Sequence, residues 1–385
     1  MAKLRLNAEL LDFLVIGGSF YGGGGGGSPE SGRELGLLAL NMGTPYLVDV
    51  SDMPDDALLL TVSAVGAPAA EGAHVLPRDY VKAIELFQRH TGKRVSGFIA
   101  NECGGLATVN GWVQSAATGL PVVDAPCNGR AHPSGVMGSM GLHLVDGYVS
   151  EQVAVGGSRE KGTYLETFIQ GSVESASGLV RRASVQAGGL VAVARNPVTA
   201  AYAKEHAAPG AIRRCLSVGR SILSARKRSA KAGVDAAARV SGGNVLRRGK
   251  VVHKELATSG GFDIGKVVVD GPVVGQAAAP APLELVFCNE YVTLEALVQA
   301  AERTADTART ASGPVRLATF PDLITTMDLS TGLPVSSAEI AVGQEIAVVT
   351  VPRSSVILGA GMADRRLYED VERATGKEIA RYASG

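Results

Sequence analysis

Six consecutive glycines, Gly22 to Gly27, constrain this chain more than any other feature of its sequence. Neither a helix nor a strand accommodates such a run easily, because an ordered glycine loses more backbone entropy than any other residue. The run must therefore be a connection. Asn7 can cap a helix before it, and Ser28-Pro29-Glu30 can open a second helix that ends near Gly43. We expect a glycine loop between two helices.

This loop does not fit a dinucleotide fingerprint, which needs a strand before its glycines. The segment from Leu10 to Phe20 has helical periodicity instead. The backbone N–H groups of Gly24, Gly25 and Gly26, together with the helix start near Pro29, could still bind an anionic group such as a carboxylate. A flexible lid is the competing interpretation.

Apolar and polar segments alternate through the first part of the chain in a way that is typical of a parallel sheet. Strands are expected at 46–50, 57–65, 95–100 and 121–124, with helices at 77–90 and 107–118. One long helix with a basic face is expected further on, at 212–232. From about residue 245 short β-rich runs follow one another, separated by Gly, Pro and Ser. We therefore predict an α/β fold with an N-terminal, mostly parallel α/β domain at 1–160. A second, increasingly β-rich domain is expected at 161–385, with a C-terminus that can return to the first domain.

The charge balance excludes several classes of partner. Lysine plus arginine equals aspartate plus glutamate at 37 each, so no global field favours nucleic acid or an acidic membrane. No apolar run reaches the roughly 18 residues that a membrane-spanning helix needs. The four cysteines lie far apart, which argues against a disulfide framework. We expect a cytoplasmic homo-oligomer that binds a small molecule, with neither nucleic acid nor membrane as partner.

The densest set of chemically active side chains follows the apolar segment Leu120 to Val123 and reads DAPCNGRAHPSGVMGSMGLH, from Asp124 to His143. In an open α/β sheet, binding and catalysis concentrate in loops after the C-terminal ends of strands. Cys127 is a candidate nucleophile or zinc ligand, and His132 its acid/base partner. His143 could complete a metal site with these two residues. The alternative is a buried thiol with hydrogen-bonded loop histidines.

A second polar turn, Asn101-Glu102-Cys103-Gly104-Gly105, follows the preceding predicted strand. Two neighbouring strands that both end in polar, glycine-rich turns predict a shared pocket. Glu102 is a candidate general base or metal ligand, and it could equally cap the following helix. Asn110 lies a short distance further on and is a candidate substrate-binding residue.

The remaining candidates would bind or orient substrate. Asp124 or Glu102 could orient an imidazole, and Arg130 could bind a carboxylate bidentately. Asn128 and the glycine-loop amides would bind substrate or stabilise developing negative charge. In Cys288-Asn289-Glu290-Tyr291, Glu290 stands between apolar runs, where an isolated charge is expensive unless it is paired. It could face the pocket from the second domain.

The order of these motifs resembles that of the S-methyl-thiohydantoin desulfurase family. The segments that carry the resemblance are FYGGGGGGSP, PVVDAPCNGRAHP, GGFDIGKVVVDG, FCNEY and FPDLITTMDLSTGLPV. The resemblance covers nearly the whole chain. It implies an N-terminal α/β domain, a more β-rich second domain, and hydrolytic desulfurisation of S-methylated thiohydantoins derived from sulfur-containing histidine derivatives. Relatives also resemble companions of hydantoinase and oxoprolinase enzymes.

Two hypotheses follow. In the first, the protein is a hydrolase of a small cyclic amide or its S-methyl thio-analogue, with Cys127 attacking the carbon between the ring nitrogens or holding a zinc ion that activates water. In the second, it is a non-catalytic subunit or ligand-binding partner of a hydantoinase- or oxoprolinase-type enzyme. The sequence identifies no cofactor with certainty, and zinc is the one candidate.

Overall fold

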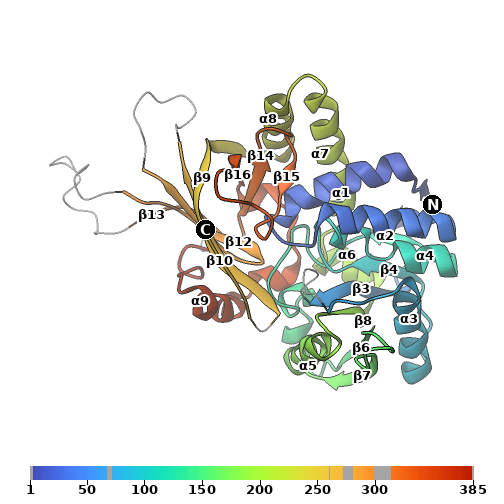
Figure 1. Ribbon diagram of the computed structural model, residues 1–385. Helices are drawn as coiled ribbons and strands as arrows, with labels where there is room; N and C mark the ends of the chain where they lie inside the picture. Colours follow the sequence, from blue (N-terminus) through green and yellow to red (C-terminus); the bar gives the residue numbers. More distant parts are fainter. Residues whose placement is uncertain (1–2, 67–71, 260, 272–280, 299–313, 384–385) are drawn as a thin grey trace.

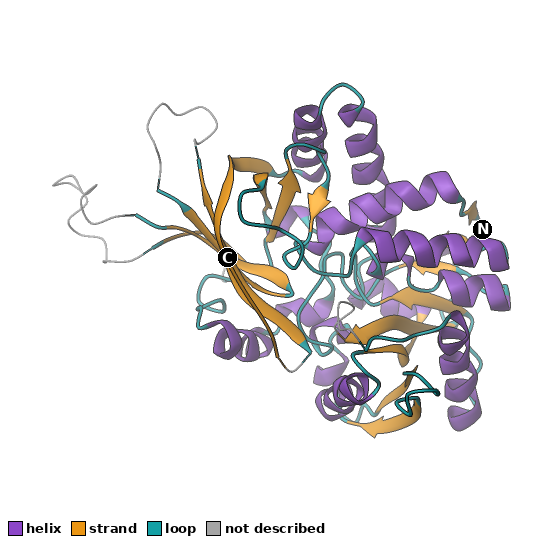
Figure 2. Ribbon diagram, in the orientation of Figure 1, coloured by secondary structure: helices purple, strands orange, loops and turns teal. Residues whose placement is uncertain are grey.

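The computed structural model describes residues 3–66, 72–259, 261–271, 281–298 and 314–383, and contains two eight-stranded sheets (Figures 1 and 2). The first sheet has the strand order β1-β2-β5-β4-β3-β8-β6-β7. Its strands are β1 Leu4–Arg5, β2 Tyr46–Asp49, β3 Leu58–Gly66, β4 Gly97–Ala100, β5 Val122–Asp124, β6 Ser150–Gly156, β7 Leu165–Gly171 and β8 Leu190–Thr199. The strands β2, β5, β4 and β3 are parallel, and the others pair antiparallel. The predicted parallel core is confirmed.

The second sheet is antiparallel throughout, with the order β13-β12-β11-β10-β9-β16-β14-β15. Its strands are β9 Asn244–Ser259, β10 Phe262–Asp270, β11 Leu283–Cys288, β12 Glu290–Ala296, β13 Val315–Thr319, β14 Leu323–Asp328, β15 Pro334–Val335 and β16 Glu345–Val351. The change at residue 245 from mixed to β-rich sequence therefore marks the first strand of this sheet. The α/β class with a β-rich second part is confirmed.

Most of the α-helices pack around the first sheet or at its junction with the second, whereas α9 packs on β10 and β11 of the second sheet (Figure 1). They are α1 Ala8–Gly22, α2 Pro29–Met42, α3 Pro77–Thr91, α4 Trp112–Thr118, α5 Val173–Gln186, α6 Ala200–His206, α7 Ala211–Arg226, α8 Ala230–Ser241 and α9 Glu369–Thr375. The side chains of Asn7 and Ser28 cap α1 and α2 as expected. The basic stretch predicted as one helix over 212–232 forms two helices, because Ser229 caps a new helix, α8.

Short 3-10 helices fill the connections. They are η1 Val50–Asp52, η2 Ala107–Val109, η3 Met137–Ser139, η4 Leu142–Leu144, η7 Arg353–Ser355, η8 Ala360–Ala363 and η9 Arg365–Tyr368. The single helix expected over 107–118 is η2 followed by α4, because Gly111 takes a left-handed φ of 96° between them. The turn keeps Asn110 close to the end of β4.

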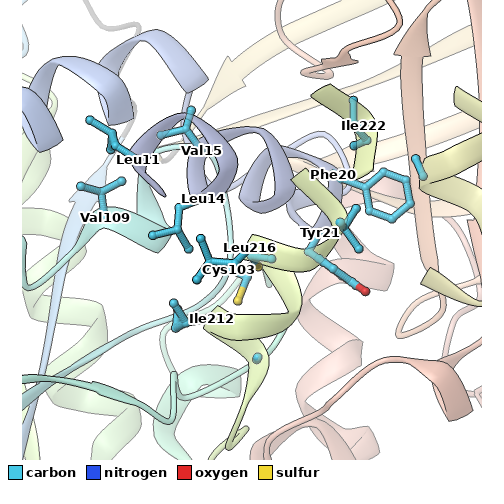
Figure 3. Close-up of a cluster of buried hydrophobic side chains, with 14 of the residues drawn as sticks. Leu11, Leu14, Val15, Phe20, Tyr21, Cys103, Val109, Ile212, Leu216 and Ile222 are labelled. Atoms are coloured by element: carbon cyan, nitrogen blue, oxygen red, sulfur yellow. The ribbon is translucent and has the colours of Figure 1, made fainter. Parts of the chain in front are cut away.

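The largest hydrophobic core lies where α1 packs on α7, with Leu14, Ile212 and Leu216 between them (Figure 3). The backbones of the two helices touch. A Cβ at Gly17 would lie 1.9 Å from the carbonyl oxygen of Cys215, and a Cβ at Gly219 would lie 1.9 Å from that of Phe13. Glycine at both positions therefore allows this approach.

The first sheet extends to residue 199, whereas the second starts at residue 244. The first sheet therefore takes strands from both sides of residue 160, and the domain boundary expected there stays a prediction. None of the helices in the described part of the chain has the length and apolar character needed to cross a bilayer.

Candidate functional site

A cavity of about 370 Å³ lies between the two sheets, within the size range of sites for small ligands. Both halves of the molecule contribute to its wall. The glycine loop and the turns after β4 and β5 line it from one half, and the hairpin between β11 and β12 lines it from the other. Among the sequence candidates, it is lined by Gly24, Gly25, Gly26, Glu102, Asn110, His132 and Glu290.

The glycine loop is fixed by its carbonyl groups. The carbonyl of Gly26 accepts the N–H groups of Leu106 and Ala107 at 3.1 and 3.0 Å, beside the first sheet. The carbonyls of Gly23 and Gly24 accept the N–H groups of Tyr291 and Ser337 at 2.8 and 3.0 Å, in the second half. Left-handed φ values of 56°, 96°, 74° and 80° at positions 23, 24, 26 and 27 turn successive carbonyls to these partners. The loop therefore joins the two halves.

His132 is buried at the cavity wall in a defined tautomer. Its Nδ1 lies 2.9 Å from the carbonyl oxygen of Ser134, which can only accept, so Nδ1 carries the proton. Its Nε2 is then an acceptor and lies 3.3 Å from Nδ2 of Asn101. Burial lowers the pKa of His132 to about 4, and the positive charge of Arg195 acts in the same direction. The ring is neutral at pH 7.

Glu102 lies against this imidazole. Its Oε2 is 3.3 Å from Nε2 of His132 and also accepts the backbone N–H of His132 at 3.1 Å. Burial raises the pKa of Glu102 to about 7, although the hydrogen bond from that N–H acts in the opposite direction. Because Nε2 of His132 is an acceptor, a proton on Glu102 is stabilised between the two groups. The pair thus combines a carboxyl that titrates near neutrality with a neutral ring.

Two residues that the sequence interpretation did not assign to the site hold this pair in place. Arg195, in β8, donates to Oδ1 of Asn101, which turns the amide Nδ2 of Asn101 towards His132. Both residues line the cavity. The available signal was a charged residue inside the apolar strand sequence LVAVARNPVT, because a buried charge needs a specific partner.

Cys127 lies outside this cavity. Its side chain is buried with Val48, Ile99 and Val123 in a hydrophobic cluster, and its sulfur contacts Oγ1 of Thr61 at 3.3 Å. Burial raises the pKa of the Cys127 thiol to about 11, so the thiolate needed by a nucleophile or ligand is disfavoured. The structure does not bring this sulfur to the cavity wall.

The carboxylate of Asp124 caps the start of α7 and does not orient an imidazole. Its carboxylate oxygens accept the N–H groups of Ile212 and Arg213 at 2.8 and 3.2 Å, in the first turn of α7. Burial raises its pKa to about 6, and these two hydrogen bonds oppose that effect. The residue joins the end of β5 to the start of α7.

Arg130 and Asn128 hold chain segments together and do not line the cavity. The guanidinium of Arg130 donates to the carbonyls of Pro321 and Asp322 and stacks 4.5 Å from the ring centre of Phe320. Asn128 bonds the carbonyl of Arg130 and the N–H of Gly359, at 2.9 and 3.1 Å. Both side chains connect the loop after β5 to the C-terminal part of the chain.

The predicted zinc ligands do not come together. His143 bonds Oγ of Ser139 and Oδ2 of Asp364, each at 3.0 Å, while Cys127 and His132 have the other surroundings described above. Among the described residues, no three His, Cys, Asp or Glu side chains are grouped as a metal site would require. The donor set expected from Cys127, His132 and His143 therefore does not fit zinc.

Glu290 and Asn110 contribute buried polar atoms that lack partners. Oε2 of Glu290 and Oδ1 of Asn110 are buried, and neither has a hydrogen-bond partner in the described part of the chain. Both residues line the cavity. Buried polar atoms are nearly always paired in folded proteins, so an unpaired one at a cavity wall indicates a place for a ligand group.

The fold and this cavity define an α/β protein with a small polar site where a mixed sheet meets an antiparallel one. The chain belongs to the S-Me-THD-like family. The model of its N-terminal domain matches residues 9–161 and that of its C-terminal domain matches residues 172–360. This confirms the resemblance to the S-methyl-thiohydantoin desulfurase family.

A protein from Chromobacterium violaceum, solved by X-ray crystallography in a structural genomics programme, has a similar structure. The TM-score is 0.70 at 23% identity, and the alignment covers 96% of this chain and 97% of the other. At this identity the likeness concerns the fold. No curated protein sequence matches the chain.

Proposed function

We propose that this protein is a hydrolase that acts in the cavity on a small S-methylated thiohydantoin or a closely related cyclic amide. Family membership supports the substrate class, since the chain matches both S-Me-THD-like domains. The observation that carries the reaction type is the Glu102–His132 pair, with Oε2 and Nε2 separated by 3.3 Å. Burial shifts the two pKa values in opposite directions, to about 7 and about 4. Such a divergence is typical of acid/base pairs in active sites.

Glu102 is the general base in this proposal. Its carboxylate takes a proton from water while the water oxygen attacks the ring carbon between the two nitrogens. The neutral imidazole of His132 accepts a hydrogen bond from the protonated Glu102 through Nε2, because Nδ1 is committed to the carbonyl of Ser134. The attack opens the C=N bond, and the second water proton ends on that ring nitrogen as the new C=O forms. The C–S bond breaks, the sulfur leaves as methanethiol with the proton held by Glu102, and a hydantoin remains. Cys127 and zinc have no part in this route, since the sulfur lies outside the cavity wall.

The test is to incubate the purified protein with an S-methyl-thiohydantoin and to follow methanethiol with a thiol reagent and hydantoin by chromatography. We expect one methanethiol per hydantoin, and a loss of about 10²- to 10⁴-fold in kcat for Glu102→Gln. Glu85→Gln on α3 is the control, because this side chain lies on a helix away from the cavity wall. A protein that binds the ring without turnover would contradict the proposal and support the role of a ligand-binding partner.

A further inference from the structure

The mechanism proposed for the Glu102–His132 pair gives no role to Glu290, which lies at the start of β12 in the antiparallel sheet. Its residue is only 2% exposed, yet it lines the cavity and its Oε2 has no partner within the described chain. Glu295, which is also buried in this sheet, is instead paired with Arg316 and Lys377 at 2.8 and 2.5 Å.

The protein leaves no room for another side chain beside this carboxyl. A Cβ at Gly25 would lie 2.4 Å from Oε1 of Glu290, so the glycine loop passes directly over it. The neighbouring carbonyls of Gly23 and Gly24 are bonded to Tyr291 and Ser337, which fixes the loop against the same hairpin. The carboxyl is therefore held in a rigid wall, although one of its oxygens is left unpaired.

The electrostatic surroundings favour the protonated form of this carboxyl. Burial raises the pKa of Glu290 well above its usual value, and the nearby carboxylate of Glu102 adds to this effect. The positive charges of Arg130 and Arg181 oppose it more weakly. Of these two arginines, Arg130 donates to backbone carbonyls through Nε and Nη1, while its buried Nη2 has no partner in the described chain. Arg181 donates to the carbonyl of Gly261 at 2.9 Å. In the protonated form that these surroundings favour, the unpaired Oε2 can donate a hydrogen bond.

We propose that Glu290 is the proton donor of the site: its Oε2–H group binds an acceptor atom of the cyclic ligand and passes its proton to the ring nitrogen during the reaction. This inference rests on the proposed function. It adds a second carboxyl to the reaction, which acts as an acid where Glu102 acts as a base. Glu102 approaches the ligand from the first sheet as a base, and Glu290 approaches from the second sheet as an acid.

The proton balance of the step is complete. As the water oxygen bonds to the ring carbon, one water proton moves to Glu102, the C=N electron pair moves to nitrogen, and that nitrogen takes the proton of Glu290. When the C–S bond breaks, the hydroxyl of the intermediate forms the new C=O and returns its proton to Glu290. Methanethiolate takes the proton from Glu102. Water is consumed, and hydantoin and methanethiol are formed.

Two substitutions separate this role from a structural one. Glu290→Gln keeps a hydrogen-bond donor at the cavity wall but cannot pass on a proton, whereas Glu290→Ala removes both properties. We expect Glu290→Gln to bind hydantoin within about threefold of the unmodified protein by calorimetry and to lose about 10²- to 10⁴-fold in kcat. Glu290→Ala should lose hydantoin affinity by at least about tenfold as well. Glu345→Gln, on the exposed side of β16, is the matched control.

The outcomes distinguish the two proposals. If the unmodified protein does not release methanethiol, the proposed function fails, and hydantoin binding alone then tests whether Glu290 contacts the ring. If Glu290→Gln retains kcat, Glu290 is not the proton donor even where the hydrolase assignment stands. Equal hydantoin affinity in Glu290→Ala and the unmodified protein, with both folded by circular dichroism, would overturn the inference.

Discussion

Oε2 of Glu102 lies 3.3 Å from Nε2 of His132, and the same oxygen also accepts the backbone N–H of that histidine. A base with a pKa of about 7 must be deprotonated to act. We therefore expect kcat/KM to rise about tenfold per pH unit below pH 7 and to fall again at the higher pH where the proton donor Glu290 ionises. Initial rates between pH 5 and 9 will measure this. A profile that keeps the same limb in Glu102→Gln would assign it to another group.

His132 should make stability depend on pH. Its folded-state pKa of about 4 lies below the ordinary 6.5, so the unfolded chain binds the proton more readily between these values. Stability is then lost as pH falls from about 6.5 to 4, by an amount on the order of 3 kcal/mol. Urea unfolding of the protein and of His132→Asn across this range measures it. The contribution of Glu102 to the pH dependence of stability has the opposite sign, because its pKa is raised in the folded state. That stability is lost as pH rises from 4.5 to about 7. A slope that is unchanged in His132→Asn would contradict the prediction.

Replacing Cys127 separates packing from chemistry. Its sulfur is buried in a hydrophobic cluster and lies outside the cavity wall. We expect Cys127→Ala to keep kcat within about twofold and to lose about 1–2 kcal/mol of unfolding free energy. Parallel rate and urea measurements check both numbers. Loss of turnover in a variant of undiminished stability would restore a chemical role to the thiol.

Asp124 should matter for stability and little for turnover. Its carboxylate accepts two N–H groups in the first turn of α7, and removal leaves both donors buried without partners. We expect Asp124→Ala to lose about 2 kcal/mol and Asp124→Asn, which keeps one acceptor, to lose less. Thermal unfolding ranks the two variants. Equal losses in the two variants would show that charge, rather than capping, is what the helix requires.

Adjacent glycines of the loop should respond differently to alanine. At Gly25 the added Cβ meets a side chain, that of Glu290, with Oε1 at 2.4 Å and Cγ at 2.7 Å. At Gly26 it meets the backbone Cα of Gly104 at 2.5 Å, and the φ of 74° is itself strained for alanine. We expect Gly25→Ala to weaken hydantoin binding and Gly26→Ala to lower the melting temperature more strongly. Calorimetry and thermal unfolding on both variants check this.

Much of the architecture could be predicted because it depends on local signals. Asn7 and Ser28 are N-caps at the positions expected from their side chains, and Pro29 begins α2. Alternation of strand and helix correctly predicted the parallel core of the first sheet. The break at Ser229 was missed because the flanking segments share one helical periodicity.

The site was only partly predictable. The sequence predicted that the polar turns after two neighbouring parallel strands lie together, and Glu102 and His132 from these turns are indeed in contact. The side chains of Cys127 and Asp124 lie in the same loop region but point to a hydrophobic cluster and a helix end. Spacing along a loop does not say which way each side chain turns. Arg195 was missed because its role comes from a contact with Asn101, far away in sequence.

The contact of α1 with α7 through Gly17 and Gly219 joins one helix from each of the two regions that match the family models. Each region therefore supplies half of one interior, and neither half buries its apolar face alone. A chimera that joins the first region of one relative to the second region of another would have to reproduce this backbone contact, so compatible pairs of regions should be inherited together.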